Sequence, residues 1–353
     1  MLGVKCYVMK TLNTQHLTLI NWIDSQHQTM IDRVIAWSLI NSGSFHVDGL
    51  RTQRIALAEA FLSLGGEQEI LPIAPLQSVD AKGNSAEIPL GEALRIRKRP
   101  YAPIQVFLGG HMDTVYPKDS EFQESRWVDE NTLNGPGVAD LKGGLAVMLT
   151  ALQALEQSPD AQNIGWEVLL NPDEEIGSTG SRPLLEEAAA RNHLGLVYEP
   201  ALADGTLAGQ RKGSGNFALV VKGRSAHAGR EFDKGRNAIA LLAEVTQALY
   251  ALNGRREGVT LNPGKIEGGG PLNVVPDTAI LRFNVRMTRH EDMSWLQQKF
   301  DELLQRFAAR EGYSLSLQGG FTRPPKILSE QNEKLFALLK DCGETLGIRV
   351  QWK

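Results

Sequence analysis

Histidine and acidic side chains gather at the ends of three apolar runs in this chain. His111 and Asp113 follow "IQVFLGG", and Glu174 and Glu175 follow "WEVLLNPD". The third run, "LGLVY", leads directly to Glu199. Imidazole nitrogens and carboxylate oxygens are ligands that zinc takes in proteins. The residue types therefore indicate a metal site, provided that the fold brings them together.

Each of these signals also has an ordinary structural explanation when it is taken alone. A lone histidine is more often a hydrogen-bonded structural residue, and three consecutive acids usually form a solvated loop. Asp140, in "NGPGVADLKGG", is a good N-cap for the helix that follows it. Considered together, the groups favour metal binding, because several carboxylates cannot all stay ionised at close range without a cation.

Two adjacent glutamates can take two different chemical roles in such a site. Two metal ions that share one carboxylate can lower the pKa of a water molecule and polarise a carbonyl group. One of Glu174 and Glu175 can then bind metal while its neighbour takes the proton from the water. Asp113 can accept a hydrogen bond from the second ring nitrogen of His111 and so fix the orientation of the ring.

The elements that must position these groups read as an α/β fold. Between the first two apolar runs lies "GGLAVMLTALQAL", whose leucine and methionine residues fall on one helical face. Apolar strands that alternate with helices predict a mostly parallel sheet covered on both faces, with ligands beyond the carboxyl ends of the strands. Helices and connections are expected before residue 100, including a helix in "VDGLRTQRIALAEAFLSLGG" that ends at a glycine pair.

A second domain is predicted from residue 210 to residue 323. Its pattern reads strand, helix, strand, strand, helix, strand, the order of a ferredoxin-like α+β sandwich, which leaves one sheet face or an edge strand for a partner. We expect this block to be inserted into the first domain, because a helix–strand pattern resumes after Pro324 and Pro325. The metal-binding domain would then comprise residues 1–209 and 324–353.

The bulk properties fit a two-domain globular protein and argue against several partners. At 353 residues the chain exceeds the usual size of one core. A net charge of −4 gives no reason to expect nucleic acid or an anionic membrane, and no apolar run is long enough to span a bilayer. Cys6 and Cys342 indicate no disulfide framework, so a cytoplasmic location is expected. No glycine-rich phosphate loop follows the first apolar strand, which argues against a nucleotide-binding enzyme.

Four stretches resemble, in the right order, the M20 family of metallopeptidases, which contains glutamate carboxypeptidase, acetylornithine deacetylase and succinyl-diaminopimelate desuccinylase. They are "GGHMDTVYP", "GPGVADLKGG", "PDEEIGS" and "VYEP", and the resemblance covers nearly the whole chain. It implies four ligands for two zinc ions, namely His111, Asp140, Glu175 and Glu199. It also implies that Asp140 bridges the ions, that Glu174 is the general base and that Asp113 supports His111. Cobalt and manganese remain alternatives to zinc.

The block from 210 to 323 resembles the lid and dimerisation domain of the same family. In "GRSAHAG", the resemblance implies that His227 stabilises the oxyanion of the tetrahedral intermediate, often in the site of a partner subunit. In "GGPLNVVPDTAILRFNVR", it implies that Asn273 binds the substrate carbonyl and that Arg286 grips a terminal carboxylate. A homodimer through this block is the implied assembly. Taken alone, a surface histidine and a strand arginine are more often solvated.

The chain departs from the family pattern at one ligand. Relatives supply a late histidine to the zinc that Glu175 would bind, whereas the last of the seven histidines here is His290, inside the 210–323 block. The Glu175 site would keep only carboxylates, so we expect weak zinc binding there and weak or no hydrolase activity. Three explanations stay open: a fragment or shortened product, a natural loss of catalysis, or a ligand from another chain.

The expected function is zinc-dependent hydrolysis of an amide bond in a small N-acyl amino acid or a peptide with a free carboxylate. Glu199, a glutamate rather than an aspartate, resembles the carboxypeptidase and deacylase branches of the family. The alternative is a non-catalytic homolog that binds a metal or an amino-acid derivative as a dimeric module. Metal counting and hydrolysis assays distinguish the two. The preferred acyl group and amino acid do not follow from the sequence.

Overall fold

The computed structural model describes residues 14–353 and divides into two compact units. Of the described residues, the first unit contains 14–76, 89–207 and 335–351, and the second contains 77–88, 208–334 and 352–353. The segment 77–88, which the sequence placed in the first domain, clusters with the second unit. Cys6 lies outside the described residues.

The first unit is built on a five-stranded sheet in the order β1-β4-β8-β5-β9. Its strands are β1 (Glu67–Leu71), β4 (Ala93–Lys98), β5 (Ile104–His111), β8 (Ile164–Asn171) and β9 (Leu194–Val197). β5 lies parallel to both β8 and β9, which confirms the α/β arrangement expected from the three apolar runs. β4 pairs antiparallel with β8 and with β1. The expectation of helices and connections alone before residue 100 was therefore wrong.

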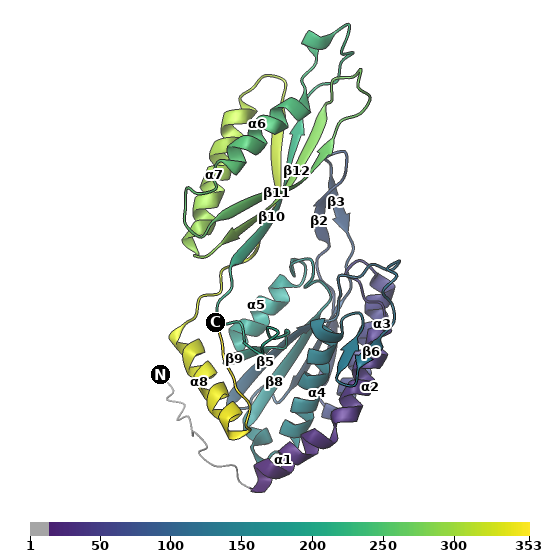
Figure 1. The fold of residues 1–353 in the computed structure, drawn as a ribbon, viewed down its shortest axis with the longest axis vertical. Coiled ribbons are helices and arrows are strands. Elements are labelled where there is room, and N and C mark those ends of the chain that lie inside the picture. Colours follow the sequence, from purple (N-terminus) through teal and green to yellow (C-terminus); the bar gives the residue numbers. More distant parts are fainter. Residues whose placement is uncertain (1–13) are drawn as a thin grey trace. The chain divides into compact units, whose positions relative to one another are not determined.

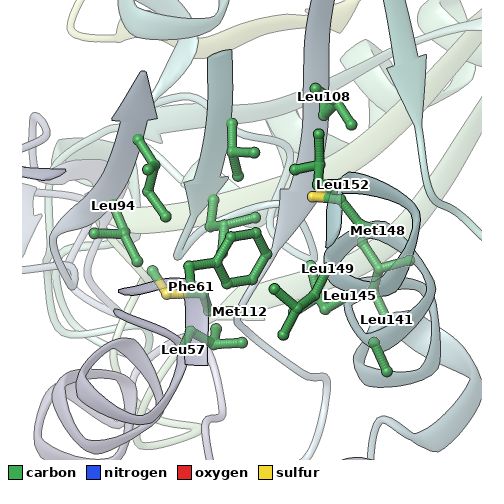
Figure 2. Packing of buried hydrophobic residues seen from close by; sticks show 14 of the residues in the cluster. Leu57, Phe61, Leu94, Leu108, Met112, Leu141, Leu145, Met148, Leu149 and Leu152 are labelled. Carbon is green, nitrogen blue, oxygen red and sulfur yellow. The ribbon is translucent and has the colours of Figure 1, made fainter. Parts of the chain in front are cut away.

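Helices cover both faces of this sheet, which is why its central strands are continuous apolar runs. The helices of this part of the chain are α1 (Thr14–Ser25), α2 (His27–Ser38), α3 (Val47–Phe61), α4 (Gly143–Glu156) and α5 (Arg182–Arg191). In β5, Leu108 packs in one core with α3 and α4, whereas Phe107 packs with Ala188 of α5. Figure 2 shows the larger core, where Phe61 of α3 lies in one cluster with Leu145 of α4. A short hairpin of β6 (Arg126–Asp129) and β7 (Thr132–Asn134) precedes α4.

One stretch of the described chain, Val138–Glu156, is long and apolar enough to cross a membrane by length and composition. Half of its apolar window is buried inside the structure. Leu145, Met148 and Leu149 are fully buried in the core of the first unit. Packing in the core of a folded unit accounts for the apolar character of this helix.

The second unit holds a four-stranded antiparallel sheet in the order β11-β12-β10-β13. Its elements are β10 (Gly213–Lys222), α6 (Ala238–Tyr250), β11 (Thr260–Gly268), β12 (Thr278–Met287), α7 (Glu291–Ala308) and β13 (Ser314–Arg323). This order confirms the predicted ferredoxin-like sandwich. Figure 1 shows α6 and α7 on the same side of the sheet, where Phe217, Leu219 and Val285 belong to the core. The chain then continues into α8 (Glu330–Thr345), whose residues from 335 on belong to the first unit.

A hairpin covers part of the other face of this sheet. It consists of β2 (Leu76–Val79) and β3 (Ser85–Ile88). Val79 packs with Val220 and Ile280, and Arg282 donates a hydrogen bond of 2.7 Å to the carbonyl of Val79. The expectation of a free sheet face therefore holds only for the part that the hairpin leaves open.

Candidate metal centre

Three parallel strands of the first unit carry candidate ligands to one rim. His111 is the last residue of β5, and it pairs in register with Asn171, the last residue of β8. β9 ends at Val197, two residues before Glu199. Because parallel strands direct their carboxyl ends the same way, the segments that leave β5, β8 and β9 start from the same edge of the sheet.

His111 stands at the centre of the resulting cluster. Its Nε2 atom lies 2.9 Å from Oδ1 of Asp140 and 3.7 Å from Oε1 of Glu199. The ligand atoms of the three residues all lie within 4.8 Å of one another. The imidazole is 1% exposed, whereas the carboxylate side chains of Asp140 and Glu199 are 50% and 31% exposed. The cluster is thus anchored in the core at the imidazole and accessible to an ion at the carboxylates.

Asp140 reaches the cluster through a break in the helical backbone. Its φ of −125° and ψ of 93° are not helical, although it lies between the left-handed Gly137 and the start of α4. Lys142 is the N-cap residue of α4, and no side chain caps this helix end. The carboxylate of Asp140 contacts Nε2 of His111. The side chain of Asp140 therefore takes part in the cluster around His111.

Asp113 is buried beside His111 and ties the site together. Its Oδ1 atom lies 3.3 Å from Nδ1 of His111, the ring nitrogen that does not face Asp140. It accepts a hydrogen bond of 2.7 Å from Oγ of Ser44 and bonds of 3.1 Å from the backbone N–H groups of Glu174 and Glu175. The backbone carbonyl oxygen of Asp113 lies still closer to Nδ1 of His111, at 3.0 Å. Asp113 therefore holds the imidazole through its backbone and its carboxylate, and the carboxylate also holds the loop that carries the two glutamates.

Ser44 is a residue of the site that sequence reasoning missed. It lies in the loop between α2 and α3 and is buried. Its loop reaches the rim because Gly43 forms a parallel bridge with Thr114. The stretch "NSGSFH" contains no ligand spacing, and only the three-dimensional pairing of the two loops brings the hydroxyl to Asp113.

The charges around the cluster favour a cation at its centre. Burial is the largest single influence on His111 and lowers its pKa, but Asp113, Asp140 and Glu199 together outweigh it and raise the pKa to about 11. Burial is also the largest influence on Glu175, where it raises the pKa. The neighbouring negative charge of Asp140 raises it further, so the pKa of Glu175 is about 7. Glu175 does not belong to the close three-residue cluster. A donor set of one imidazole and two carboxylates under this excess of negative charge fits a zinc ion.

Two buried charged residues near the site have structural contacts. Asp173 is 0% exposed and accepts hydrogen bonds from the N–H groups of Gly180 and Ser181, which shapes the loop after β8. The Nζ atom of Lys142 donates 2.8 Å hydrogen bonds to the carbonyls of Trp37 and Ile40, and burial lowers the pKa of Lys142 to about 7. Both residues hold the loops that carry the candidate ligands.

In the second unit, His227 and Asn273 lie side by side on exposed turns. A backbone bridge joins His227 to Val274, and the N–H of Ala228 donates to the carbonyl of Asn273 at 2.9 Å. The N–H of Gly229 donates to Nδ1 of His227 at 3.1 Å. A neutral imidazole that accepts at Nδ1 carries its proton on Nε2, so His227 can donate a hydrogen bond from that atom.

Arg286 lies at the other end of the same sheet. In the pairing of β10 with β12, Lys222 stands opposite Thr278 and Ser214 stands opposite Arg286. His227 follows Lys222, so its turn leaves the sheet at the Thr278 end. Eight residues of extended strand separate the two ends, which corresponds to roughly 25 Å. Within one copy, Arg286 and the His227–Asn273 pair are therefore not neighbours.

Two family models match the chain. The one described as a peptidase dimerisation domain of M20 type matches residues 210–311, and the one described as peptidase family M28 matches residues 94–208. The first match falls within the ferredoxin-like unit. The second contains His111, Asp140 and Glu199.

Curated relatives are similar over half of the chain or more. Carboxypeptidase G2 from Pseudomonas sp. (strain RS-16) is 30% identical over 278 residues, which cover 76% of this chain and 65% of that protein. Succinyl-diaminopimelate desuccinylase 2 from Shewanella loihica is 31% identical over 206 residues, which cover 52% of this chain and 53% of that protein. The matched part of the chain thus spans between half and two thirds of the length of these relatives.

A solved structure extends the likeness to nearly the whole chain. The YXEP protein of Bacillus subtilis, described as a dinuclear metal-binding peptidase from the M20 family, matches with a TM-score of 0.57 and 15% identity over 94% of this chain and 83% of that one. The chain is therefore similar to peptidases in its first unit and to their dimerisation domain in its second. The M28 match is confined to the first unit, whereas the M20-type dimerisation model matches residues 210–311 and carboxypeptidase G2 is similar over 76% of the chain.

Proposed function

We propose that the protein is a zinc-dependent amidohydrolase that cleaves an N-acyl amino acid or a small peptide with a free carboxylate. The observation that carries this proposal is the cluster of His111, Asp140 and Glu199, whose ligand atoms lie within 4.8 Å of one another. The carboxypeptidase and desuccinylase relatives support the substrate class. Both names describe enzymes that release an amino acid with a free carboxylate.

The residues present favour unequal affinity at two metal positions. His111, Asp140 and Glu199 offer one imidazole and two carboxylates to the first ion. A second ion would share Asp140 and take Glu175, and among the described residues no second imidazole joins the close cluster. Because zinc prefers a nitrogen or sulfur ligand to a set of carboxylates alone, we expect one tightly and one weakly held ion. Cobalt or manganese would enter the same positions.

The chain's own groups account for the proton transfers. When bound, the metal ions supply Lewis acidity, which polarises the amide carbonyl and makes a water molecule more acidic. Glu174 is placed by its backbone bond to Asp113 and would take the proton of the attacking water, then deliver a proton to the leaving nitrogen. Asp113 would hold the ring of His111 in one orientation throughout.

The second unit would complete the site through a homodimer. A hydrogen bond from Nε2 of His227 would stabilise the oxyanion, Asn273 would bind the substrate carbonyl and Arg286 would bind the carboxylate. These groups lie at opposite ends of one sheet, roughly 25 Å apart. A small substrate cannot span that distance. If both ends contact one substrate, they must come from two copies, in keeping with the dimerisation-domain match.

Zinc counting and hydrolysis assays test this proposal together. The protein is stripped of metal, loaded with zinc, dialysed and analysed, and turnover is measured on a panel of N-acyl amino acids. We expect about one zinc retained per chain, and zinc-dependent turnover that rises as a weaker second position fills. His111→Ala should lose the retained zinc, whereas the exposed His290→Ala should keep it. Zinc retention without turnover on any substrate would instead support the non-catalytic homolog.

A further inference from the structure

A cavity of about 320 Å³ lies between α6 and α7 in the second unit. The two helices pack against each other on the same side of the sheet (Figure 1). The residues that line the cavity are Ala248, Ala251, Leu252, Arg255, Lys299, Glu302, Leu303 and Arg306. The volume lies near the lower end of the range of small-molecule binding pockets. None of these residues has a role in the candidate metal centre or in the proposed contacts of His227, Asn273 and Arg286.

The charged side chains of the lining carry an excess of positive charge. Arg255, Lys299 and Arg306 are cations and Glu302 is an anion, so the four side chains together carry a charge of +2. The carboxylate of Glu302 is already bound, because it accepts hydrogen bonds of 2.7 Å from Lys299 and 2.9 Å from Gln298. Lys299 and Glu302 therefore neutralise each other, and the excess charge belongs to the two arginines.

These two arginines differ from a close neighbour in having no carboxylate partner among the described residues. Arg310, four residues after Arg306, donates two hydrogen bonds of 2.8 and 2.5 Å to the carboxylate of Glu244 on α6. Arg255 and Arg306 form no such ion pair within the part of the chain that the structure describes. Their guanidinium groups are thus open to an anion from outside the chain.

A structural role at the helix ends accounts for part of this positive charge. Arg255 follows α6, and its Nε atom donates to the carbonyl of Ala251 at 2.9 Å. Arg306 belongs to the last turn of α7. Cations at such positions stabilise the C-terminal carbonyl groups of a helix. The bond from Nε leaves the two terminal nitrogens of the Arg255 guanidinium for a ligand.

The rest of the lining is apolar. Leu252 is 5% exposed and Leu303 is half-buried, so both present fixed apolar surface to the cavity. Ala248 and Ala251 have short side chains, which leaves room above α6. A ligand that matches this lining combines an anionic group with an apolar body, since the guanidinium groups bind the charge and the apolar surface is removed from water.

The charge of the surrounding block also favours an anion. Between residues 208 and 334 the chain has 19 lysine and arginine residues and 13 aspartate and glutamate residues. The whole chain has a net charge of −4, so this block has the opposite sign to the protein as a whole. A positive surface raises the local concentration of anions and speeds their association.

We propose that the cavity between α6 and α7 binds a phosphate monoester. Its phosphoryl group, with a charge of about −2 at neutral pH, matches the charge of the lining. Arg255 and Arg306 would hold the phosphate oxygens through parallel hydrogen bonds, and the organic part would lie against Leu252 and Leu303. A carboxylate of similar size would neutralise only half of the charge. Because the cavity shares no residue with the candidate metal centre, this binding does not depend on the proposed hydrolase activity.

Calorimetric titration of zinc-loaded protein with phenyl phosphate tests this assignment. We expect phenyl phosphate to bind at least tenfold more tightly than inorganic phosphate, which lacks the ring, and than benzoate, which carries one charge. Arg255→Ala and Arg306→Ala should each weaken its binding roughly tenfold or more. Arg224 supplies the matched control, because it is exposed in the same unit and lies outside the cavity, and Arg224→Ala should bind as the wild type does. Unchanged melting temperatures show that the variants fold.

Two further variants separate this cavity from the other groups that attract anions. Phenyl phosphate can also contact zinc at His111 or the guanidinium of Arg286, so His111→Ala and Arg286→Ala are titrated in the same way. We expect both to keep wild-type affinity, which would support the cavity even if no amide is hydrolysed. Loss of binding in either of them, with Arg255→Ala and Arg306→Ala unaffected, would overturn the assignment. Benzoate or inorganic phosphate that binds as tightly as phenyl phosphate would overturn the ligand class.

Discussion

The two units hold their candidate functional groups in opposite ways. In the first unit, His111 and Asp113 are each 1% exposed and are fixed by Ser44 and by the loop after β8. In the second unit, His227 and Asn273 are exposed, and Arg286 lies at the far end of the same sheet. The first arrangement is preorganised within one copy of the chain. In the second arrangement the groups do not converge within one copy of the chain.

The largest expected effect comes from the preorganised unit. Glu174→Gln keeps the size of the side chain but removes its ability to take a proton. We expect kcat to fall by roughly 10²–10⁴ while the zinc content of the protein stays unchanged. The exposed Glu186 on α5 offers a matched control, and Glu186→Gln should retain full turnover. Full activity of the Glu174 variant would remove this residue from the mechanism.

His227→Ala tests the exposed unit and should lower kcat by roughly 10²–10³, because one oxyanion donor is lost. Zinc affinity should not change, since His227 belongs to the second unit. Mixing equal amounts of the His227→Ala and Glu174→Gln proteins should then restore about a quarter of the wild-type turnover. Half of the dimers would be mixed, and each would contain one site with both intact groups. Mixtures that stay inactive after subunit exchange would contradict sharing between copies.

Ser44→Ala should have a smaller effect, confined to the metal centre. Removing the hydroxyl frees Asp113 on one side, so we expect zinc to bind roughly 10- to 100-fold more weakly. Ser42 provides the control, because it lies two residues away in the same loop, is buried and has no hydrogen-bond partner for its hydroxyl. Competition with a chelator of known affinity measures both variants. If Ser42→Ala weakened zinc binding as much as Ser44→Ala does, the cause would be a change in the loop rather than loss of the hydrogen bond from Ser44 to Asp113.

The smallest expected effect is on the stability of the first unit, away from the site. Burial opposes ionisation of Glu156, but hydrogen bonds from Arg99, Lys98 and Trp166 outweigh it and lower its pKa to about 2. A lowered pKa in the folded state stabilises the fold at pH values above the unfolded pKa, and this stabilisation is lost as the pH falls through the folded pKa. Glu156→Gln should therefore cost about 2 kcal/mol at pH 7 and progressively less from pH 4.5 to pH 2.

Chemical denaturation at several pH values measures that difference. The exposed Glu330 on α8 supplies a comparison, since its ion pair with Lys334 is fully solvated and Glu330→Gln should change the free energy of unfolding little at any pH. If Glu156→Gln lowered the free energy of unfolding by the same amount in acid as at pH 7, Glu156 would stabilise the unit through packing rather than through its charge.

The sequence predicted the parts of the molecule in which a local residue pattern also implies which segments lie side by side. The continuous apolar runs of β5, β8 and β9 reveal strands buried on both faces, and the carboxyl ends of parallel strands must share one rim. His111, Asp140 and Glu199 were predicted as one cluster for this reason, and the structure brings them together.

Other features have no local signal. β4 reads "ALRIRK", an alternation of apolar and basic residues that marks a strand with unequal faces, and it was overlooked among helices. Ser44 lies in a loop, and its position depends on how this loop pairs with the segment after β5 through the bridge between Gly43 and Thr114. Loop pairing of this kind is set by close backbone approach, as at Gly43, rather than by residue periodicity.

The most direct test of the account is the position of a metal ion in crystals grown with zinc. Anomalous scattering at the zinc edge should show a peak within about 2.0–2.2 Å of Nε2 of His111 and of one carboxylate oxygen each from Asp140 and Glu199. A second, weaker peak should lie between Asp140 and Glu175. Density for zinc at other residues, with His111 contacting no ion at saturating zinc, would contradict the central claim.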